Sequence, residues 1–201
     1  VYAIHNYIRY TGDEAYMAQG GWEVILGVAR FWAQRVNWSE AKNAWVILGV
    51  TGPNEYENNV NNNWYTNHLA AWCLKRACAA LDWLKEHAPD HLNSTSAQWS
   101  FEEAKERPHW ESVAAGMYHP KLEGTRVFLQ QDGFMDKDQQ MAADLPDSDR
   151  PINQHWSWDR ILRSVFIKQA DTLQGLYFFE GEFDVETHRE NFEFYEPRTV
   201  H

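Results

Sequence analysis

The stretch VTGPNEYENNVNNNWYTNHLAAWCLKRACAALDWLKEHAP, residues 50–89, decides the fold of the chain. Gly52-Pro53 predicts a turn after a short β-prone run, and an Asn-rich segment follows as far as Asn63. Residues 64–87 predict a long helix, which Pro89 ends. The stretch therefore predicts a long, ordered loop that leads into a long helix.

Further helices are predicted on both sides of this stretch. Residues 1–10 are typical of the end of a helix, and Asp13 follows a Thr-Gly turn, where it is placed to cap the next helix. Long helices joined by long loops predict an all-α fold whose function lies in the loops. The other predicted elements are helices at about 14–36, 97–105 (ended or kinked by Pro108), 113–117, 161–180 and partly 186–201, short β-prone runs at 45–50 and 126–131, and an ordered loop at 136–154.

The composition is ordinary for a globular protein except in its aromatic residues. Hydrophobic residues make up 44% of the 201 residues and charged residues 23%, and a chain of this length can bury a sizeable core. The aromatic content is 15%, with 11 Trp. Carbohydrate sites use aromatic faces to pack against the apolar face of a sugar, but the same rings are also common in protein cores.

Charge and cysteine content narrow the range of partners. The net charge of -11 argues against nucleic acid or an anionic membrane, although a local cluster of donors can still bind phosphate. Cys73 and Cys78 share one predicted helix, which favours a reduced, cytoplasmic protein over a disulfide framework. The sequence contains no signal peptide and no apolar run long enough to span a bilayer. Because it begins at Val1 in the middle of a helical pattern, we expect further residues before it.

The most informative candidate for chemistry is Glu55, which the Gly-Pro turn presents just before the Asn-rich segment. Cleavage of a glycosidic bond needs a carboxylic acid near the leaving oxygen, with a pKa raised enough for it to be protonated near neutral pH. A carboxylate in a rigid loop with aromatic neighbours suits that role, and Asn side chains can bind sugar hydroxyls. The alternative is that Glu55 is a solvated loop residue and that the Asn residues form turns and caps.

Two further segments carry polar groups that suit a sugar. Lys168 and Gln169 lie at the polar edge of the predicted helix 161–180 and can donate to sugar hydroxyls or phosphate, or simply form an exposed helix face. Residues 128–134 and 150–160 mix Gln, Asp, Asn, His and Trp, as in a sugar-lined cleft or a well-packed loop. The sequence has no HExxH or CxxC metal pattern, no Gly-rich phosphate loop and no Gly-x-Ser-x-Gly motif, so we expect no metal and no nucleotide.

These segments together resemble glycoside hydrolase family 65, the inverting phosphorylases for maltose and related α-glucobioses. Three motifs carry the resemblance, and they occur in the family's order across nearly the whole chain. Residues 129–134 and 150–160 further resemble the maltose phosphorylase branch of the family. The three motifs are Gly52-Pro53-Asn54-Glu55-Tyr56 with the Asn-rich run and Tyr65-Thr66-Asn67, then Lys168-Gln169-Ala170-Asp171, and then Phe194-Tyr195-Glu196-Pro197-Arg198-Thr199-Val200-His201.

The resemblance implies a fold and a set of site residues. The fold is an (α/α)6 barrel, and residues 1–201 are expected to be part of a single catalytic domain that is truncated at both ends. By its place in the motif, Glu55 is implied to be the general acid, and Glu57, its nearest rival, lies outside the matched position. Lys168 and Gln169 are implied to contact the glucosyl unit, and Asn54 and Tyr56, which flank Glu55, are further candidates for substrate binding.

The implied reaction is inverting phosphorolysis of maltose to β-glucose 1-phosphate and glucose. Glu55 protonates the bridging oxygen, and inorganic phosphate attacks the anomeric carbon from the opposite face. An inverting hydrolase needs a second carboxylate to activate water, whereas phosphate is already an anionic nucleophile. One acid is therefore enough, and no metal or organic cofactor is expected beyond phosphate as co-substrate.

The chain departs from the family in its extent. It stops at His201, before the family's Ser-containing phosphate loop, so we expect the phosphate-binding residues mostly beyond it and little activity from these residues alone, because helices cut from a barrel expose apolar faces. Family resemblance suggests a homodimer. The alternatives are a kojibiose, nigerose or trehalose phosphorylase, a trehalose hydrolase of the same family, or a non-catalytic, carbohydrate-binding helical fragment.

Overall fold

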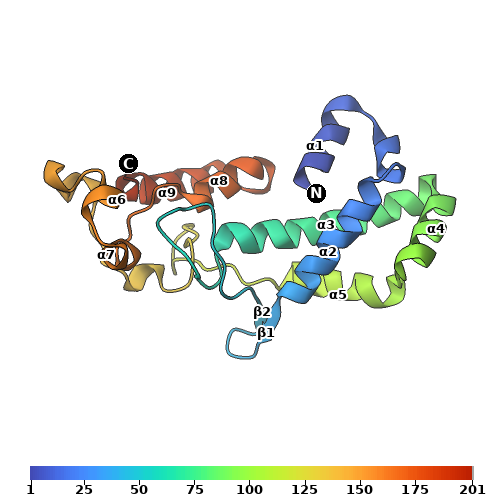
Figure 1. Cartoon of the computed structure of the whole chain (residues 1–201), viewed down its shortest axis with the longest axis horizontal. Helices are drawn as coiled ribbons and strands as arrows, with labels where there is room; N and C mark the ends of the chain where they lie inside the picture. The colour runs from blue at the N-terminus through green and yellow to red at the C-terminus, as the bar shows by residue number, and fades with distance from the viewer. Residues whose placement is uncertain (201) are drawn as a thin grey trace. The chain divides into compact units, whose positions relative to one another are not determined.

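The computed structural model describes residues 1–200, without the side chain of Glu180, and is built mainly of helices (Figure 1). His201, the last residue of the third motif, lies outside the described residues. The chain divides into two units. The first unit contains Val1–Trp45 and Leu69–Met117, and the second contains Val46–His68 and the residues from Tyr118 onward.

The first unit is helical except for one small hairpin. The helix predicted at 64–87 is present as α3, Trp64–His87, whose first turn belongs to the second unit. The other elements are α1 (Tyr2–Thr11), the 3-10 helix η1 (Glu14–Ala18), α2 (Gly21–Arg35), strands β1 (Asn37–Ser39) and β2 (Ala44–Val46), α4 (Pro89–Trp99) and α5 (Glu103–Gly116).

The core of the first unit lies between α2, α3 and α5. Trp22 and Trp110 are almost fully buried, and the ring of Phe101 lies between them, with centroid distances of 5.5 and 5.7 Å. Aromatic pairs of this kind add to the burial of apolar surface, which is the main stabilising contribution. The aliphatic part of the core consists of Ile25, Leu26 and Ala29 from α2, Leu74, Ala77, Leu81 and Leu84 from α3, and Val113 from α5.

Two helix predictions for the first unit are wrong. The helix expected at 14–36 is broken at Gly20, whose φ of 123° is a conformation that glycine adopts readily, so η1 and α2 are separate. The expected Asp13 cap does not form, and its carboxylate instead accepts from the Tyr7 hydroxyl at 2.9 Å. The helix expected at 97–105 is instead interrupted by Ser100 in the left-handed region, and Pro108 lies inside α5 without ending it.

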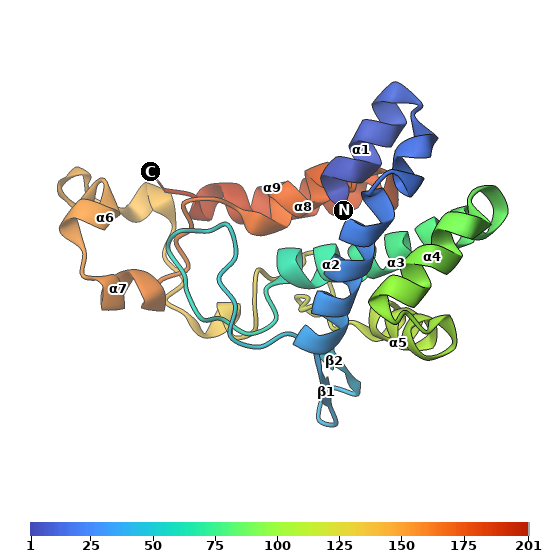
Figure 2. The same ribbon diagram turned by 45° about the vertical axis from the view of Figure 1, so that its right-hand side comes forward.

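The second unit consists of short helices joined by long ordered loops, as expected for residues 136–154. In it α8 and α9 lie side by side in both views (Figure 1, Figure 2). The elements are α6 (Ile152–His155), α7 (Trp158–Arg163), α8 (Asp171–Phe178), α9 (Val185–Tyr195), and the 3-10 helices Phe134–Asp136, Ala142–Asp144, Asp147–Asp149, Glu180–Glu182 and Glu196–Arg198.

The continuous helix predicted at 161–180 is also wrong. Residues 164–170 are non-helical and connect α7 to α8. Ile167 forms a parallel bridge with Thr199. The Ile167 N–H donates to the Arg198 carbonyl at 3.1 Å, and the Ile167 carbonyl accepts from the Val200 N–H at 2.9 Å. These long-range hydrogen bonds, together with full burial of Ile167, override the helical pattern. The β-prone run at 126–131 forms one isolated bridge, between Lys121 and Phe128, rather than a strand.

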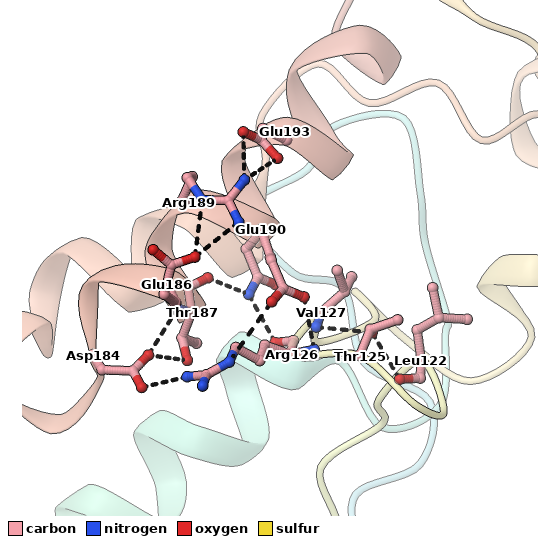
Figure 3. A network of polar contacts seen from close by, with 11 residues as sticks. Leu122, Thr125, Arg126, Val127, Asp184, Glu186, Thr187, Arg189, Glu190 and Glu193 are labelled. Atoms are coloured by element: carbon pink, nitrogen blue, oxygen red, sulfur yellow. Dashed lines mark hydrogen bonds and ion pairs between the residues drawn. The ribbon is translucent and has the colours of Figure 1, made fainter.

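Helix α9 is fixed to the turn at 122–127 by a polar network (Figure 3). Arg126 forms an ion pair with Asp184, the residue before α9, and its backbone N–H donates to Glu190 at 3.0 Å. Asp184 caps α9 by accepting from the Thr187 N–H at 2.8 Å. The network thereby holds the segment that leads to Gln130 and Gln131 against helix α9.

Candidate functional site

Residues 51–59, which we call the Glu55 loop, are closed at their base by backbone hydrogen bonds. Val50 and Val60 form an antiparallel bridge, and each N–H lies 2.8 Å from the other's carbonyl. Just outside this bridge, the Asn62 N–H donates to the Ile47 carbonyl at 2.8 Å. The two ends of the Glu55 loop are therefore held together at its base.

The Asn-rich run has a structural role. Asn61 Oδ1 accepts from the Gly49 N–H at 3.0 Å, and Asn62 Oδ1 accepts from the Ile47 N–H at 3.1 Å. Asn63 caps α3, because its Oδ1 accepts from the Thr66 N–H at 2.9 Å. The structure thus favours the alternative expected from the sequence for Asn61–Asn63, in which these residues form turns and caps.

The structure brings Glu55 together with Lys168 and Gln169, which are 113 and 114 positions away in the sequence. The Lys168 ammonium forms an ion pair with Glu55 Oε2. Gln169 makes two hydrogen bonds with the same residue: its Nε2 donates to Glu55 Oε1 at 3.3 Å, and its Oε1 accepts from the Glu55 N–H at 3.2 Å. The Glu55 side chain is 60% exposed, so its carboxylate is accessible to a ligand.

Lys168 and Gln169 lie in the non-helical segment before α8, not on a helix edge as predicted. Asn54 fixes this segment to the Glu55 loop, because its Oδ1 accepts from the Lys168 N–H at 3.0 Å and faces the Tyr56 N–H at 3.3 Å. The side chains of Asn54 and Tyr56 are almost completely buried. Tyr56 packs in an apolar cluster with Leu145, Ile152, Trp156, Ile161, Phe166 and Val200.

The electrostatic environment of Glu55 favours its charged form. The hydrogen bond and the positive charge of Lys168, followed by the hydrogen bond from Gln169, hold the pKa of Glu55 below its ordinary value. A general acid near neutral pH needs the opposite shift, so the raised pKa expected from the sequence is absent while Lys168 is paired with Glu55.

Replacing Lys168 with methionine should therefore raise the pKa of Glu55, because the largest cause of its lowering is removed. We expect the ¹³C NMR titration of the Glu55 carboxyl in the protein to move to higher pH, with the signal identified by its loss in Glu55→Gln. Lys121→Met, at an exposed position, is the control and should leave the titration unchanged. An unchanged midpoint in Lys168→Met would mean that the ion pair does not form in solution.

Glu57, the rival acid, has a different environment. It is 3% exposed and forms a buried ion pair with Lys137. Gln130 and Gln131, also buried, direct their side-chain amides at the two Glu57 oxygens, at 3.3 Å from Gln130. Glu57 is therefore enclosed by its own partners, and the two glutamines of the 128–134 segment hold it in place.

The 150–160 segment contributes packing and one exposed ring. Trp156 is buried, its indole N–H donates to Asp149 at 2.8 Å, and the Arg160 guanidinium lies 3.5 Å from its ring centroid. Trp158 is 45% exposed. Within this segment Trp158 is thus the large aromatic residue that remains available to a ligand.

Sequence reasoning gave no role to Asp171, which is fully buried beside the Glu55 loop. It accepts from Asn63 Nδ2 at 3.0 Å. The only signal in the sequence was its place in the second motif, in which Lys168 and Gln169, but not Asp171, were assigned a role.

Among residues 1–200 no group of three or more His, Cys, Asp or Glu side chains is arranged to hold a metal ion. Across the same residues, every helix is too short or too polar to cross a bilayer.

The family model for the glycosyl hydrolase family 65 central catalytic domain matches residues 1–201. The chain therefore belongs to this family, as its motifs predicted. The predicted fold class, an all-α part of an (α/α)6 barrel with long loops, is confirmed as well. The structure is mainly helical, and all of this chain superposes on part of the solved phosphorylase structure described below.

Several disaccharide phosphorylases are similar to this chain. It is 50% identical over 200 residues to maltose phosphorylase of Bacillus subtilis (strain 168), covering all of this chain and 25% of that protein. It is 36% identical to kojibiose phosphorylase of Halothermothrix orenii over 200 residues, all of this chain and 26% of that protein. A solved structure from the human microbiome, provisionally described as a kojibiose phosphorylase, has 30% identity and a TM-score of 0.87, covering 100% of this chain and 27% of that one. The chain thus spans about a quarter of the length of its relatives.

Proposed function

We propose that this chain is the acid-bearing part of a disaccharide phosphorylase that cleaves maltose with inorganic phosphate. The observation that carries the proposal is the Glu55 carboxylate, which is exposed on a fixed loop and held by Lys168 and Gln169. In this proposal residues 1–201 belong to one catalytic domain. The products are glucose and β-glucose 1-phosphate.

Glu55 acts as the general acid. The carboxylic acid donates its proton to the bridging oxygen as the bond from that oxygen to the anomeric carbon breaks. Phosphate attacks the same carbon from the opposite face, which inverts its configuration. Because phosphate brings its own negative charge, no second carboxylate has to activate a nucleophile, and the enclosed Glu57 has no part in the chemistry.

Lys168 must change partner for this reaction. While it is paired with Glu55, the carboxylate stays ionised. A glucosyl unit that accepts hydrogen bonds from Lys168 and Gln169 draws both donors away from Glu55. The sugar also excludes water from the carboxyl group, and both effects raise its pKa. Binding of substrate thus prepares the acid for its protonated state.

Maltose is proposed as the substrate because identity is 50% to a maltose phosphorylase and 36% to a kojibiose phosphorylase. The test is a panel of maltose, kojibiose, nigerose and trehalose, each supplied with phosphate to the full-length enzyme. We expect the highest kcat/KM with maltose. A higher value with another disaccharide would move the assignment to that linkage, and binding of sugars without any turnover would favour a non-catalytic role.

A further inference from the structure

Asp171 joins three parts of the second unit. As the first residue of α8, it donates its backbone N–H to Gln130 Oε1 at 3.2 Å. Its Oδ2 accepts from Asn63, the cap of α3, at 3.0 Å. The backbone N–H of Asn54, next to Glu55, also interacts with its carboxylate. One buried side chain therefore connects α8, α3 and the Glu55 loop.

The contact with the loop is very close at Gly52. A Cβ atom at this position would lie 2.1 Å from Asp171 Oδ2 and 2.7 Å from Asn63 Nδ2, closer than any side chain can approach. Only glycine, which has no Cβ, fits at position 52, and the Gly52 backbone packs against the Asp171 carboxylate. Gly52 is three residues before Glu55, so Asp171 contacts the same loop that carries the acid.

We propose that Asp171 is a positioning residue for Glu55, which holds the Glu55 loop against the cap of α3 so that the acid meets the glycosidic oxygen. This inference rests on the proposed function of Glu55. Asp171 itself touches no substrate, because its side chain is fully buried.

The groups that face Asp171 explain its charge state. Glu57 from the Glu55 loop and Tyr195 from α9 are its titratable neighbours, and Lys137 is paired with Glu57 rather than with Asp171. Burial, followed by repulsion from Glu57, raises the pKa of Asp171 to about 7. The hydrogen bonds from the Asn63 side-chain amide and from the Asn54 backbone N–H act in the opposite direction and lower this pKa. Asp171 Oδ1 has no hydrogen-bond partner among the described residues, which suits a carboxyl that is partly protonated at neutral pH.

The first test compares Asp171→Ala with wild type in the full-length enzyme, using maltose and α-glucosyl fluoride as substrates. Loss of the contact should lower kcat for maltose by about 10²-fold with little change in KM, because a displaced acid affects the transition state and not ground-state binding. Fluoride leaves without a proton, so the deficit should nearly vanish with α-glucosyl fluoride. An equal deficit with both substrates, or none with maltose, would overturn the positioning role.

A second test needs no activity and uses the isosteric Asp171→Asn. An acid whose pKa is raised on folding contributes stability at low pH that is lost as pH rises from its unfolded value near 4 to about 7. The Tm of Asp171→Asn relative to wild type should therefore increase between pH 4 and 7 and then level off. Asp144→Asn, at an exposed site, is the control for the same change of side chain outside the core. A pH-independent difference for Asp171→Asn would contradict the buried, shifted carboxyl.

Measuring Glu55→Gln beside Asp171→Ala with the same two substrates separates this inference from the proposed function. If Glu55→Gln itself keeps full activity with maltose, the role of Glu55 as acid fails. If Glu55→Gln is inactive with maltose and rescued by α-glucosyl fluoride while Asp171→Ala behaves as wild type, only the inference about Asp171 fails.

Discussion

Replacing Glu55 with glutamine should lower kcat for maltose phosphorolysis by about 10³-fold or more, since a positioned general acid contributes roughly 10² to 10⁴ to the rate. Glutamine keeps the size of the side chain and can still accept from Lys168 and Gln169, so binding of maltose should change little. The measurement is the initial rate of glucose formation by the full-length enzyme at saturating phosphate. Glu123→Gln, at an exposed turn, is the matched control and should retain wild-type activity.

The loss should depend on the leaving group. With α-glucosyl fluoride, whose leaving group needs no proton, Glu55→Gln should approach the wild-type rate. This pattern separates loss of the acid from disruption of the loop, because a misfolded loop would be slow with both substrates. Wild-type activity of Glu55→Gln with maltose would remove this residue from the mechanism.

The second large effect is expected on stability. Among the described residues, Lys137→Met leaves the buried Glu57 carboxylate with only the two glutamine amides as partners. The substitution should lower the free energy of unfolding by about 3–5 kcal/mol. The measurement is denaturant or thermal unfolding of the full-length enzyme, followed by circular dichroism. Lys105→Met is the control, because the Lys105–Glu102 ion pair is exposed and should contribute less than about 1 kcal/mol.

A double variant tests the cause of that effect. Adding Glu57→Gln to Lys137→Met removes the unpaired charge, so the double variant should be more stable than Lys137→Met alone. If the two substitutions simply add, the destabilisation comes from lost packing of the lysine stem and not from the buried carboxylate.

The sequence predicted the elements whose signals are local. The long helix after the Asn-rich run begins at Trp64 and ends at His87 as expected, because a cap at its start and Pro89 after its end both act within a few residues. The long loop at 136–154 was predicted correctly as far as Pro151, because it is polar and rich in turn formers, whereas the short helix α6 begins at Ile152.

Elements fixed by distant partners could not be predicted in this way. Residues 164–170 have a helical pattern but are held by backbone hydrogen bonds to Asp138, Arg198 and Val200, which lie far away in the sequence. The same limit applies to the site. The family resemblance suggested Glu55, Lys168 and Gln169 together, whereas the buried contacts of Glu57 and Asp171 depend on pairings that only the fold creates.

The most direct test of the proposed function is the dependence of maltose cleavage on phosphate. The full-length enzyme is incubated with maltose, with and without inorganic phosphate, and both glucose and β-glucose 1-phosphate are assayed. We predict that the two products form in equal amounts and only when phosphate is present. Release of glucose at the same rate without phosphate would contradict phosphorolysis and assign the protein to the hydrolases.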